Sequence, residues 1–458
     1  MNVSIQKQYK RIVSTFCPAG ERAVNLLAYA SFVQNVDAKP IWTQAFREAL
    51  KEHRHLFLPK GKYYIDDTVI LPSGTRIVAH KKAEICLVKG TKVVGFRSAE
   101  VIDGSTKRVD LDAPMSENIT ICGGIWSTEF TERAEYGKVG ALDPADSMHG
   151  VHALMLFSGV RNLHLKRMTI KHAPAFALQL GRLDRFVVED VRFVSCYADG
   201  VHVNGFVQNG LIRNVSGECG DDLVALNAYD WQNSTIHRGP IENVVVANVR
   251  SKGNAFHLMR LLPGVTSKSE GEIDCYIQDI LISNIRGVST YKLYLQTPSY
   301  RGTPEGASVG WMKNVTIQKL RIVKDRPSDQ TPNYLDADPI TGHFGVFELG
   351  SHIDGLTLRD IRVKFKCEEK YQSLAHLIVA GPKSCYLEKE HLEIFDPYVK
   401  STVKNLAYRN IRVDGKRVSD LREHIKEISF EGLYASDCTD GFGRIESVRQ
   451  IKRKKDKA

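Results

Sequence analysis

Three aspartates stand out because their spacing could bring their carboxylates together. Asp199 lies in CYADGVHVNG (196–205), and Asp221 and Asp222 lie in ECGDDLVALNA (218–228). Asp221 and Asp222 follow Asp199 by 22 and 23 residues, which is about one coil of a stacked β-structure. Neighbouring strands lie about 4.8 Å apart, so we expect the three carboxylates to share one small exposed face.

Such a cluster could perform acid–base chemistry. Like charges raise one another's pKa, so one carboxyl group can hold a proton near neutral pH while the others stay ionised. Glycoside hydrolysis requires this combination of an acid and a base. Two other interpretations are open: Asp-Gly and Gly-Asp are common turn sequences, and carboxylates that share a face also bind calcium. The occurrence of both segments one coil apart favours chemistry over turns.

A repeated strand pattern in the sequence indicates which elements position these residues. From Asn118 onward, short apolar–polar strands recur, usually beside an Asn or Asp. The spacings are 24, 34, 36 and 35 residues between the equivalent positions Val187, Leu211, Val245, Leu281 and Thr316. Such repeats indicate stacked units that bury a continuous core only together. The chain lacks the helical segments that alternate with strands in a Rossmann fold or TIM barrel, and its period is shorter than that of a β-propeller blade.

We therefore predict an all-β fold, a right-handed parallel β-helix with an N-terminal helical cap. Apolar residues at helical spacing predict a helix from Lys39 to His53, followed by short β-rich runs. This helix can cover the open apolar end of the stack, and Asn residues can form hydrogen-bonded ladders between coils. The predicted organisation is an N-terminal segment (1–37), a single β-helix domain (38–440) and a basic tail (441–458).

The composition is that of a folded protein, with 43% apolar and 25% charged residues. The net charge of +10 favours an anionic partner such as an acidic polysaccharide. Aromatic and basic residues do not interleave, and no run of about 18 apolar residues occurs, so we expect neither nucleic acid nor a membrane as partner. Nine scattered cysteines and the lack of a convincing signal peptide favour a cytoplasmic over a secreted location. Nothing in the sequence specifies an oligomeric state.

The acidic segments resemble motifs of glycoside hydrolase family 28, the polygalacturonases and their relatives. The Asn-Thr-Asp-Gly of that family appears here as YADG, and its Gly-Asp-Asp is intact as GDD. The opening FLPKGKYYI (57–65) is similar to an element of the wider pectin-lyase-like β-helix superfamily. The resemblance covers roughly residues 38–415. It implies a right-handed parallel β-helix and an inverting hydrolase, in which Asp221 is the general acid while Asp199 and Asp222 position and deprotonate the water.

The sugar-recognition residues of the family are not in register here. Where the family has Gly-His-Gly, this chain has GNAFH (253–257), and where it has Arg-Ile-Lys, this chain has YKLYLQT (291–297). We therefore look for substrate-binding residues among the basic and aromatic side chains near the acidic segments. The candidates are His202, His257, Arg260, Lys292, Arg301 and Trp231. Arginine can hold a carboxylate through two hydrogen bonds, and a tryptophan ring can stack on a sugar face. The alternative for each is a packing role.

The sequence thus predicts a polygalacturonase-like glycoside hydrolase that cleaves an acidic polysaccharide or oligosaccharide. One alternative is a polysaccharide lyase or epimerase on the same fold, which would need a basic residue and often calcium. Another is a non-catalytic β-helix that binds carbohydrate or forms part of a phage tail. No P-loop, GxGxxG, HExxH or GxSxG motif occurs in the sequence, so we expect no cofactor and no metal.

Overall fold

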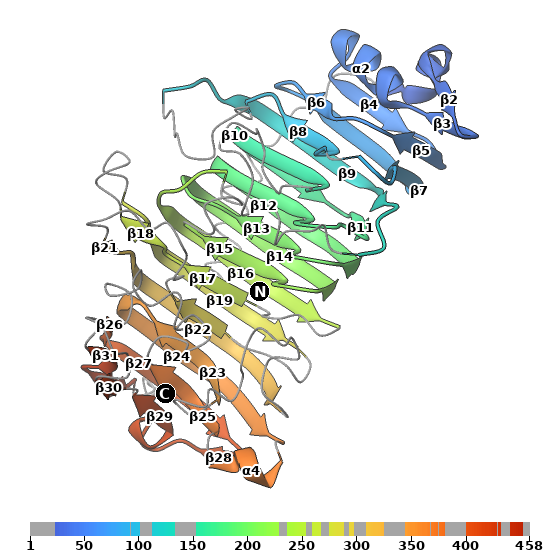
Figure 1. The fold of residues 1–458 in the computed structure, drawn as a ribbon. Coiled ribbons are helices and arrows are strands. Elements are labelled where there is room, and N and C mark those ends of the chain that lie inside the picture. Colours follow the sequence, from blue (N-terminus) through green and yellow to red (C-terminus); the bar gives the residue numbers. More distant parts are fainter. Residues whose placement is uncertain are drawn as a thin grey trace, which may run out of the picture. The chain divides into compact units, whose positions relative to one another are not determined.

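Strands dominate the structure, a computed structural model shown in Figure 1. It describes residues 23–91, 93–100, 112–132, 153–228, 236–252, 259–266, 274–287, 293–296, 308–324, 344–366, 368–373, 375–380, 400–427, 429–431 and 440–451. The chain divides into two compact units, which we call unit 1 (Met1–Ala225 with Gln232–Arg238) and unit 2 (Leu226–Trp231 with Gly239–Ala458). The predicted all-β class is confirmed, since the α-helices among the described residues are two short segments.

The elements fall into the two units in chain order. Those of unit 1 are β1 (Val24–Asn25), η1 (Leu26–Phe32), β2 (Gln34–Val36), β3 (Lys39–Ile41), α2 (Thr43–Glu52), β4 (His55–Leu58), β5 (Gly61–Ile65), β6 (Val69–Leu71), β7 (Arg76–Leu87), β8 (Phe96–Ser98), β9 (Ser116–Thr128), β10 (Met155–Lys166), β11 (Thr169–Lys171), β12 (Leu178–Cys196), β13 (Val201–Val203) and β14 (Val207–Cys219). The strand β15 (Val224–Asn227) spans the division. Those of unit 2 are β16 (Ile241–Ser251), β17 (Met259–Leu262), β18 (Val265–Thr266), β19 (Tyr276–Arg286), β20 (Leu293–Gln296), β21 (Ser308–Val309), β22 (Trp311–Lys324), β23 (Phe344–Gly350), β24 (His352–Phe365), α4 (Glu369–Gln372), β25 (Ala375–Ala380), β26 (Lys400–Lys404), β27 (Leu406–Val413), β28 (Lys416–Arg417), η5 (Arg422–His424), β29 (Ile425–Glu427), β30 (Ser429–Glu431), β31 (Asp440–Ile445) and β32 (Val448–Gln450).

Successive coils pair through parallel strands. In unit 1, β10 pairs with β12 and β12 with β14, and Val187 lies opposite Leu211. In unit 2, β16, β19 and β22 pair in the same way, with Val245 opposite Leu281 and Leu281 opposite Thr316. Within each unit, residues that the sequence repeat made equivalent are therefore Cα partners. The repeat is confirmed there at the level of register.

Asn residues mark left-handed bends within the long strands, which explains why the sequence pattern repeats. Asn118 and Asn162 have left-handed φ values of 59° and 63°, which Asn tolerates better than most residues. The side chain of Asn162 also donates to Asn118 Oδ1 at 2.9 Å, one coil away. In unit 2, Asn284 donates to Asn248 at 2.7 Å. The predicted ladders are confirmed, and the same residue type both turns the chain and links the coils.

The helix α2 packs on the first strands of unit 1. The side chains that it buries are Thr43, Ala45, Phe46, Ala49 and Leu50. Phe46 packs edge-on against Phe96, with ring centroids 5.6 Å apart. The helix begins at Thr43 and not at Lys39 as predicted, because Lys39–Ile41 forms β3 and pairs antiparallel with β2. No helix in the described ranges has the length and apolarity needed to cross a membrane.

Candidate active site

The three aspartates lie at the same corner of two successive coils in unit 1. Asp199 lies between β12 and β13, and Asp221 and Asp222 lie between β14 and β15. The corner is in register, because Cys196 and Cys219, which end β12 and β14, are Cα partners. The stacking of two short loops at this corner is therefore what brings the acidic residues together.

The glycines of both motifs allow the loops to stack this closely. A Cβ atom at Gly200 would lie 2.7 Å from the carbonyl oxygen of Leu223, and one at Gly220 would lie 2.6 Å from that of Tyr197. Both distances are shorter than ordinary contacts, so a side chain at either position would push the coils apart. The loops are instead joined by backbone hydrogen bonds, such as the 2.8 Å bond from the Gly200 N–H to the Asp222 carbonyl.

The carboxylates form a tight cluster with unequal exposure. One oxygen from each of Asp199, Asp221 and Asp222 lies within 4.8 Å of the others. Asp199 and Asp222 have no exposed surface, whereas Asp221 is half-buried. The predicted sharing of one face is thus observed, but only one of the three carboxyl-bearing residues reaches the surface.

A chain of hydrogen bonds fixes the Asp199 carboxylate. The His202 Nδ1–H donates to Asp199 Oδ2 at 2.6 Å, and the Asn204 amide donates to His202 Nε2 at 3.2 Å, which is the arrangement of a neutral imidazole. Gln179 donates to Asn204 Oδ1 at 3.1 Å, and the Asp222 backbone N–H donates to Asp199 Oδ1 at 3.0 Å. All five residues are fully buried, so this network holds Asp199 in one orientation.

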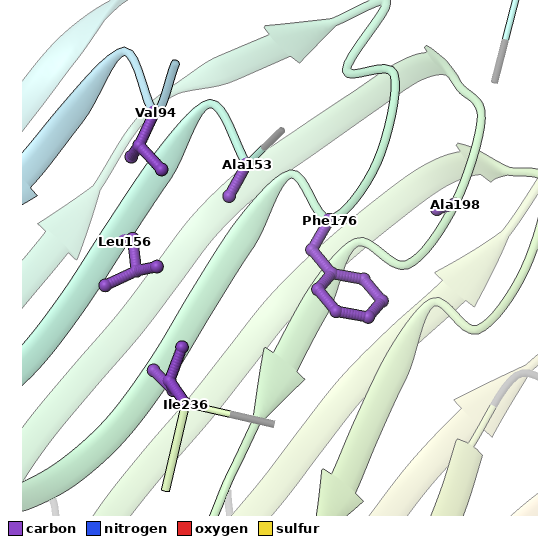
Figure 2. Packing of buried hydrophobic residues seen from close by; sticks show 6 residues of the cluster. All are labelled: Val94, Ala153, Leu156, Phe176, Ala198 and Ile236. Atoms are coloured by element: carbon purple, nitrogen blue, oxygen red, sulfur yellow. The ribbon is translucent and has the colours of Figure 1, made fainter. Parts of the chain in front are cut away.

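Apolar side chains enclose the network. Phe176, Ala198 and Ile236 belong to one buried cluster (Figure 2). The Phe176 ring stacks on the His202 ring, with centroids 3.8 Å apart and 15° between the planes. The Ile236 backbone N–H donates to Asn204 Oδ1 at 3.3 Å. Hydrogen bonds in such low-polarity surroundings are stronger than in water, which adds to the rigidity of the network.

The electrostatic effect of the cluster extends to the thiol next to it. Cys219 lies two residues before Asp221 and is buried. Burial raises the pKa of the Cys219 thiol well above its ordinary value, and a hydrogen bond with Cys196 and the charges of Asp199 and Asp222 raise it further. This thiol therefore stays protonated near neutral pH, whereas a reactive cysteine needs its thiolate form.

The structure describes two of the predicted substrate-binding residues. His202 is covered by Phe176 and bonded to Asp199, so its burial favours positioning of Asp199 over contact with a substrate. Arg260 lies in β17 of unit 2 and is 8% exposed. The candidates that lie outside the described residues are His257, Lys292, Arg301 and Trp231.

Sequence reasoning missed Gln179, Asn204 and Phe176. Gln179 and Asn204 are 25 residues apart, and this spacing of about one coil is the signal that could have linked them. Amides and aromatic rings are common in strands, however, and nothing in the residue types marks these three. Their role follows only from the side-chain contacts.

Comparisons with known proteins found similarity in structure but not in sequence. No family model matches the chain, and no curated protein matches its sequence. The surface adhesin PfbA of Streptococcus pneumoniae is 13% identical, over 86% of this chain and 89% of its own, with a TM-score of 0.51. The family 28 exopolygalacturonase of Yersinia enterocolitica is 12% identical, over 86% and 72%, with a TM-score of 0.48. The hyperthermoactive exopolygalacturonase of Thermotoga maritima is 12% identical, over 90% and 97%, with a TM-score of 0.45.

At 13% identity, the likeness to the adhesin concerns the fold alone. It does not distinguish an enzyme from a binding protein, and that distinction depends on the chemistry of the acidic corner.

Proposed function

We propose that this protein is a glycoside hydrolase whose reaction depends on Asp199, Asp221 and Asp222. The observation that carries the proposal is the cluster of three carboxylate oxygens within 4.8 Å on adjacent coils. Like charges this close are unfavourable unless a reaction or a ligand uses them. The close stacking of the loops depends on Gly200 and Gly220, and one hydrogen bond from the Asp222 N–H to Asp199 does not account for a cluster of three aspartates.

The unequal burial of the carboxylates supports a division of roles. Asp221 reaches the surface and is our general acid, which protonates the leaving oxygen of the glycosidic bond. Asp199 accepts hydrogen bonds from His202 and from the backbone of Asp222, which suits a carboxylate that stays ionised and acts as a base. Asp199 and Asp222 together then position and deprotonate the attacking water.

The stereochemistry follows from the family resemblance and not from the carboxylate separation. An inverting enzyme generally needs roughly 6.5–9.5 Å between its carboxyl groups to fit a water, and a retaining enzyme roughly 5–5.5 Å. One oxygen from each carboxylate lies within 4.8 Å of the others, which is a distance between single oxygens and not between carboxyl groups. We keep inversion as the proposal, on the strength of the two motifs. Retention is the second candidate, because a close approach of carboxylate oxygens also suits a retaining enzyme.

The proposed fold and substrate rest on further observations. Parallel, in-register coils in each unit support a right-handed parallel β-helix. The net charge of +10 and the family 28 motifs support an acidic polysaccharide or oligosaccharide as substrate. Of the predicted basic contacts, Arg260, Lys292 and Arg301 stay candidates for holding its carboxylates.

Product analysis tests the proposal directly. Polygalacturonate and other polyuronates, with a neutral glucan beside them, would be incubated with the protein and the products weighed by mass spectrometry. Hydrolysis adds one water for each bond cleaved, and proton NMR of the first product reports whether the anomeric configuration is inverted. Binding without any cleavage across the panel would contradict the proposal and favour a binding protein.

The same three oxygens support a calcium-dependent lyase as an alternative reaction. Carboxylate oxygens that converge in this way are ligands that calcium accepts. A lyase adds no water and leaves an unsaturated product that absorbs in the ultraviolet. Loss of cleavage with a chelator, recovery with calcium and an absorbing product would together favour the lyase over the hydrolase.

A further inference from the structure

Unit 2 carries one arginine at the same place on each of five successive coils. The strands β16, β19, β22, β24 and β27 follow one another in parallel register (Figure 1). Arg250 pairs with Arg286, Arg286 with Arg321, Arg321 with Arg362, and Arg362 with Arg412. All five residues are exposed. With strands about 4.8 Å apart, this arginine row extends over roughly 19 Å.

The fold does not require arginine at this position. Arg250 and Arg412 each lie two residues after an Asn with a left-handed backbone, Asn248 and Asn410 respectively. The residues that follow a left-handed corner residue by two in successive coils of unit 1 are Thr169, Arg192 and Ser216. Threonine and serine therefore fit such a position, and the unbroken run of arginines in unit 2 needs another explanation.

Carboxylates of the described chain do not neutralise the row. None of the five guanidinium groups forms an ion pair with an acidic side chain among the described residues. Asp360, two residues before Arg362, pairs with Arg409 instead, at 3.7 Å. The strands that carry neighbouring arginines lie about 4.8 Å apart, which is less than the Debye length of about 8 Å, so the positive charges of the row repel one another. An anion that lies along the row would remove this repulsion.

The row borders a groove that could receive a chain. The groove has a volume of about 460 Å³. Arg321, Arg362, Arg412 and Lys364 line it with positive charge, and Val323 provides an exposed apolar wall. Since these residues come from three successive coils, the groove crosses the strands in the direction of the arginine row.

We propose that the arginine row is a binding track for one linear acidic polysaccharide, separate from the acidic residues of unit 1. Such a chain carries one carboxylate on each sugar and so presents negative charges at short regular intervals, as the coils present positive ones. The planar guanidinium group can hold each carboxylate through two parallel hydrogen bonds. The track rests on the proposed function only for the choice of sugar, because it binds substrate without cleaving it.

Nucleic acid is the less favoured occupant. Single-stranded nucleic acids are bound by aromatic side chains on which the bases stack, in addition to basic groups. The groove is lined by Arg321, Ile322, Val323, Arg362, Val363, Lys364, Arg412 and Gly415, without an aromatic side chain among these described residues. A polyuronate needs only the charges and the hydrogen bonds of the row.

The test compares two triple variants that remove the same charge. Arg286→Gln/Arg321→Gln/Arg362→Gln interrupts the row. The control Arg76→Gln/Lys81→Gln/Lys82→Gln removes three exposed positive charges from β7 in unit 1. Both are made in an Asp221→Asn background so that no cleavage interferes. Binding of polygalacturonate is measured by fluorescence anisotropy at several salt concentrations, and circular dichroism confirms folding.

The row variant should bind polygalacturonate about 10- to 100-fold more weakly than its parent, since each exposed ion pair contributes roughly two- to fivefold. Its salt dependence should also become shallower, because fewer counterions are released on binding. The control should change by less than about threefold. Arg321→Lys, which keeps the charge but loses the planar fork, should weaken binding by a smaller factor.

Three results would overturn the proposal. They are unchanged binding by the row variant, equal weakening by both triple variants, and tighter row-dependent binding of single-stranded DNA than of polygalacturonate. The first two would leave the arginines without a specific role, and the third would make the row a nucleic-acid site. None of these results bears on hydrolysis, which the product analysis above tests independently.

Discussion

Unit 1 buries carboxylates in two places that are built differently. Glu189, on β12, accepts a hydrogen bond from His164 at 2.8 Å on one oxygen. Its other oxygen accepts two from Arg213 at 2.8 and 2.5 Å. At the acidic corner, Asp199 instead accepts from the neutral His202 and from a backbone N–H, beside two further aspartates. Glu189 is paired with an arginine and a histidine on neighbouring strands, whereas Asp199 lies beside two other aspartates on stacked loops.

This difference distinguishes an acidic residue that stabilises the fold from acidic residues that are available for a reaction. Burial alone would raise the pKa of Glu189, but its bonds to His164 and Arg213 lower it to about 2. Such a group is locked in its charged form and holds three coils together. At the acidic corner the two loops are joined by backbone hydrogen bonds, to which Asp199 adds one bond from the Asp222 N–H, while the His202 side chain donates to its carboxylate. We therefore expect the two places to respond to mutation in opposite ways.

The largest effect should come from the acidic corner. Asp221→Asn and Asp222→Asn should each lower kcat by about 100- to 10,000-fold, because each removes a proton-transfer group that acts in the transition state. Thermal unfolding should stay unchanged or shift upward, since each variant removes one of three like charges. Steady-state kinetics with a polyuronate and calorimetric unfolding measure the two effects. A variant that loses stability but keeps its turnover would show that these aspartates only stabilise the turns.

Glu189→Gln should behave in the opposite way. Removing this charge breaks the ion pair of Glu189 with Arg213, and breaking a buried pair lowers the free energy of unfolding by about 3 kcal/mol. Turnover per folded molecule should be unchanged, because Glu189 lies within the strand ladder and not at the acidic corner. Urea unfolding gives the stability, and activity below the transition gives the turnover. A large loss of kcat with little loss of stability would contradict the structural role.

The pH dependence of stability is a second test of the structural role of Glu189. The pKa of Glu189 falls from an ordinary 4.5 to about 2 on folding, so the unfolded chain binds this proton more readily. Its contribution is therefore complete above about pH 4.5 and is lost as the pH falls toward 2. The wild-type protein should lose more stability across this window than Glu189→Gln does. Parallel curves for the two proteins would show that Glu189 contributes no such dependence.

The all-β class and the register of the parallel strands could be predicted because the sequence pattern repeats at regular intervals along the chain. The pairs Val187–Leu211 and Val245–Leu281 are Cα partners, as the repeat required. Asn162 both turns the chain and bonds to Asn118, so one residue type at fixed intervals revealed the coils. The start of α2 was misplaced because the strand pairing of Lys39–Ile41 overrides its helical pattern.

The acidic corner could be predicted only in part. The motif spacing placed Asp199 and Asp222 on adjacent coils, because the distance between them in the sequence is about the length of one coil. The spacing could not show that both are fully buried, nor that Phe176 covers His202, because these depend on side chains packed from several coils. It also could not show how closely the two loops stack, because this depends on the contacts that Gly200 and Gly220 permit.

The smallest effect should come from His202, whose role the sequence and the structure assign differently. If it positions Asp199, His202→Asn should lower kcat by roughly tenfold and leave KM almost unchanged, because only the orientation of the base is lost. If it binds the substrate as the sequence predicted, KM should rise while kcat holds. Phe176→Leu is the matched control, since it removes the stacked ring but keeps the hydrogen bond from His202 to Asp199. A small drop in kcat for Phe176→Leu, with a larger one for His202→Asn, would show that the hydrogen bond and not the packing holds Asp199. Equal drops would assign the effect to packing, and a rise in KM confined to His202→Asn would restore the substrate-binding role.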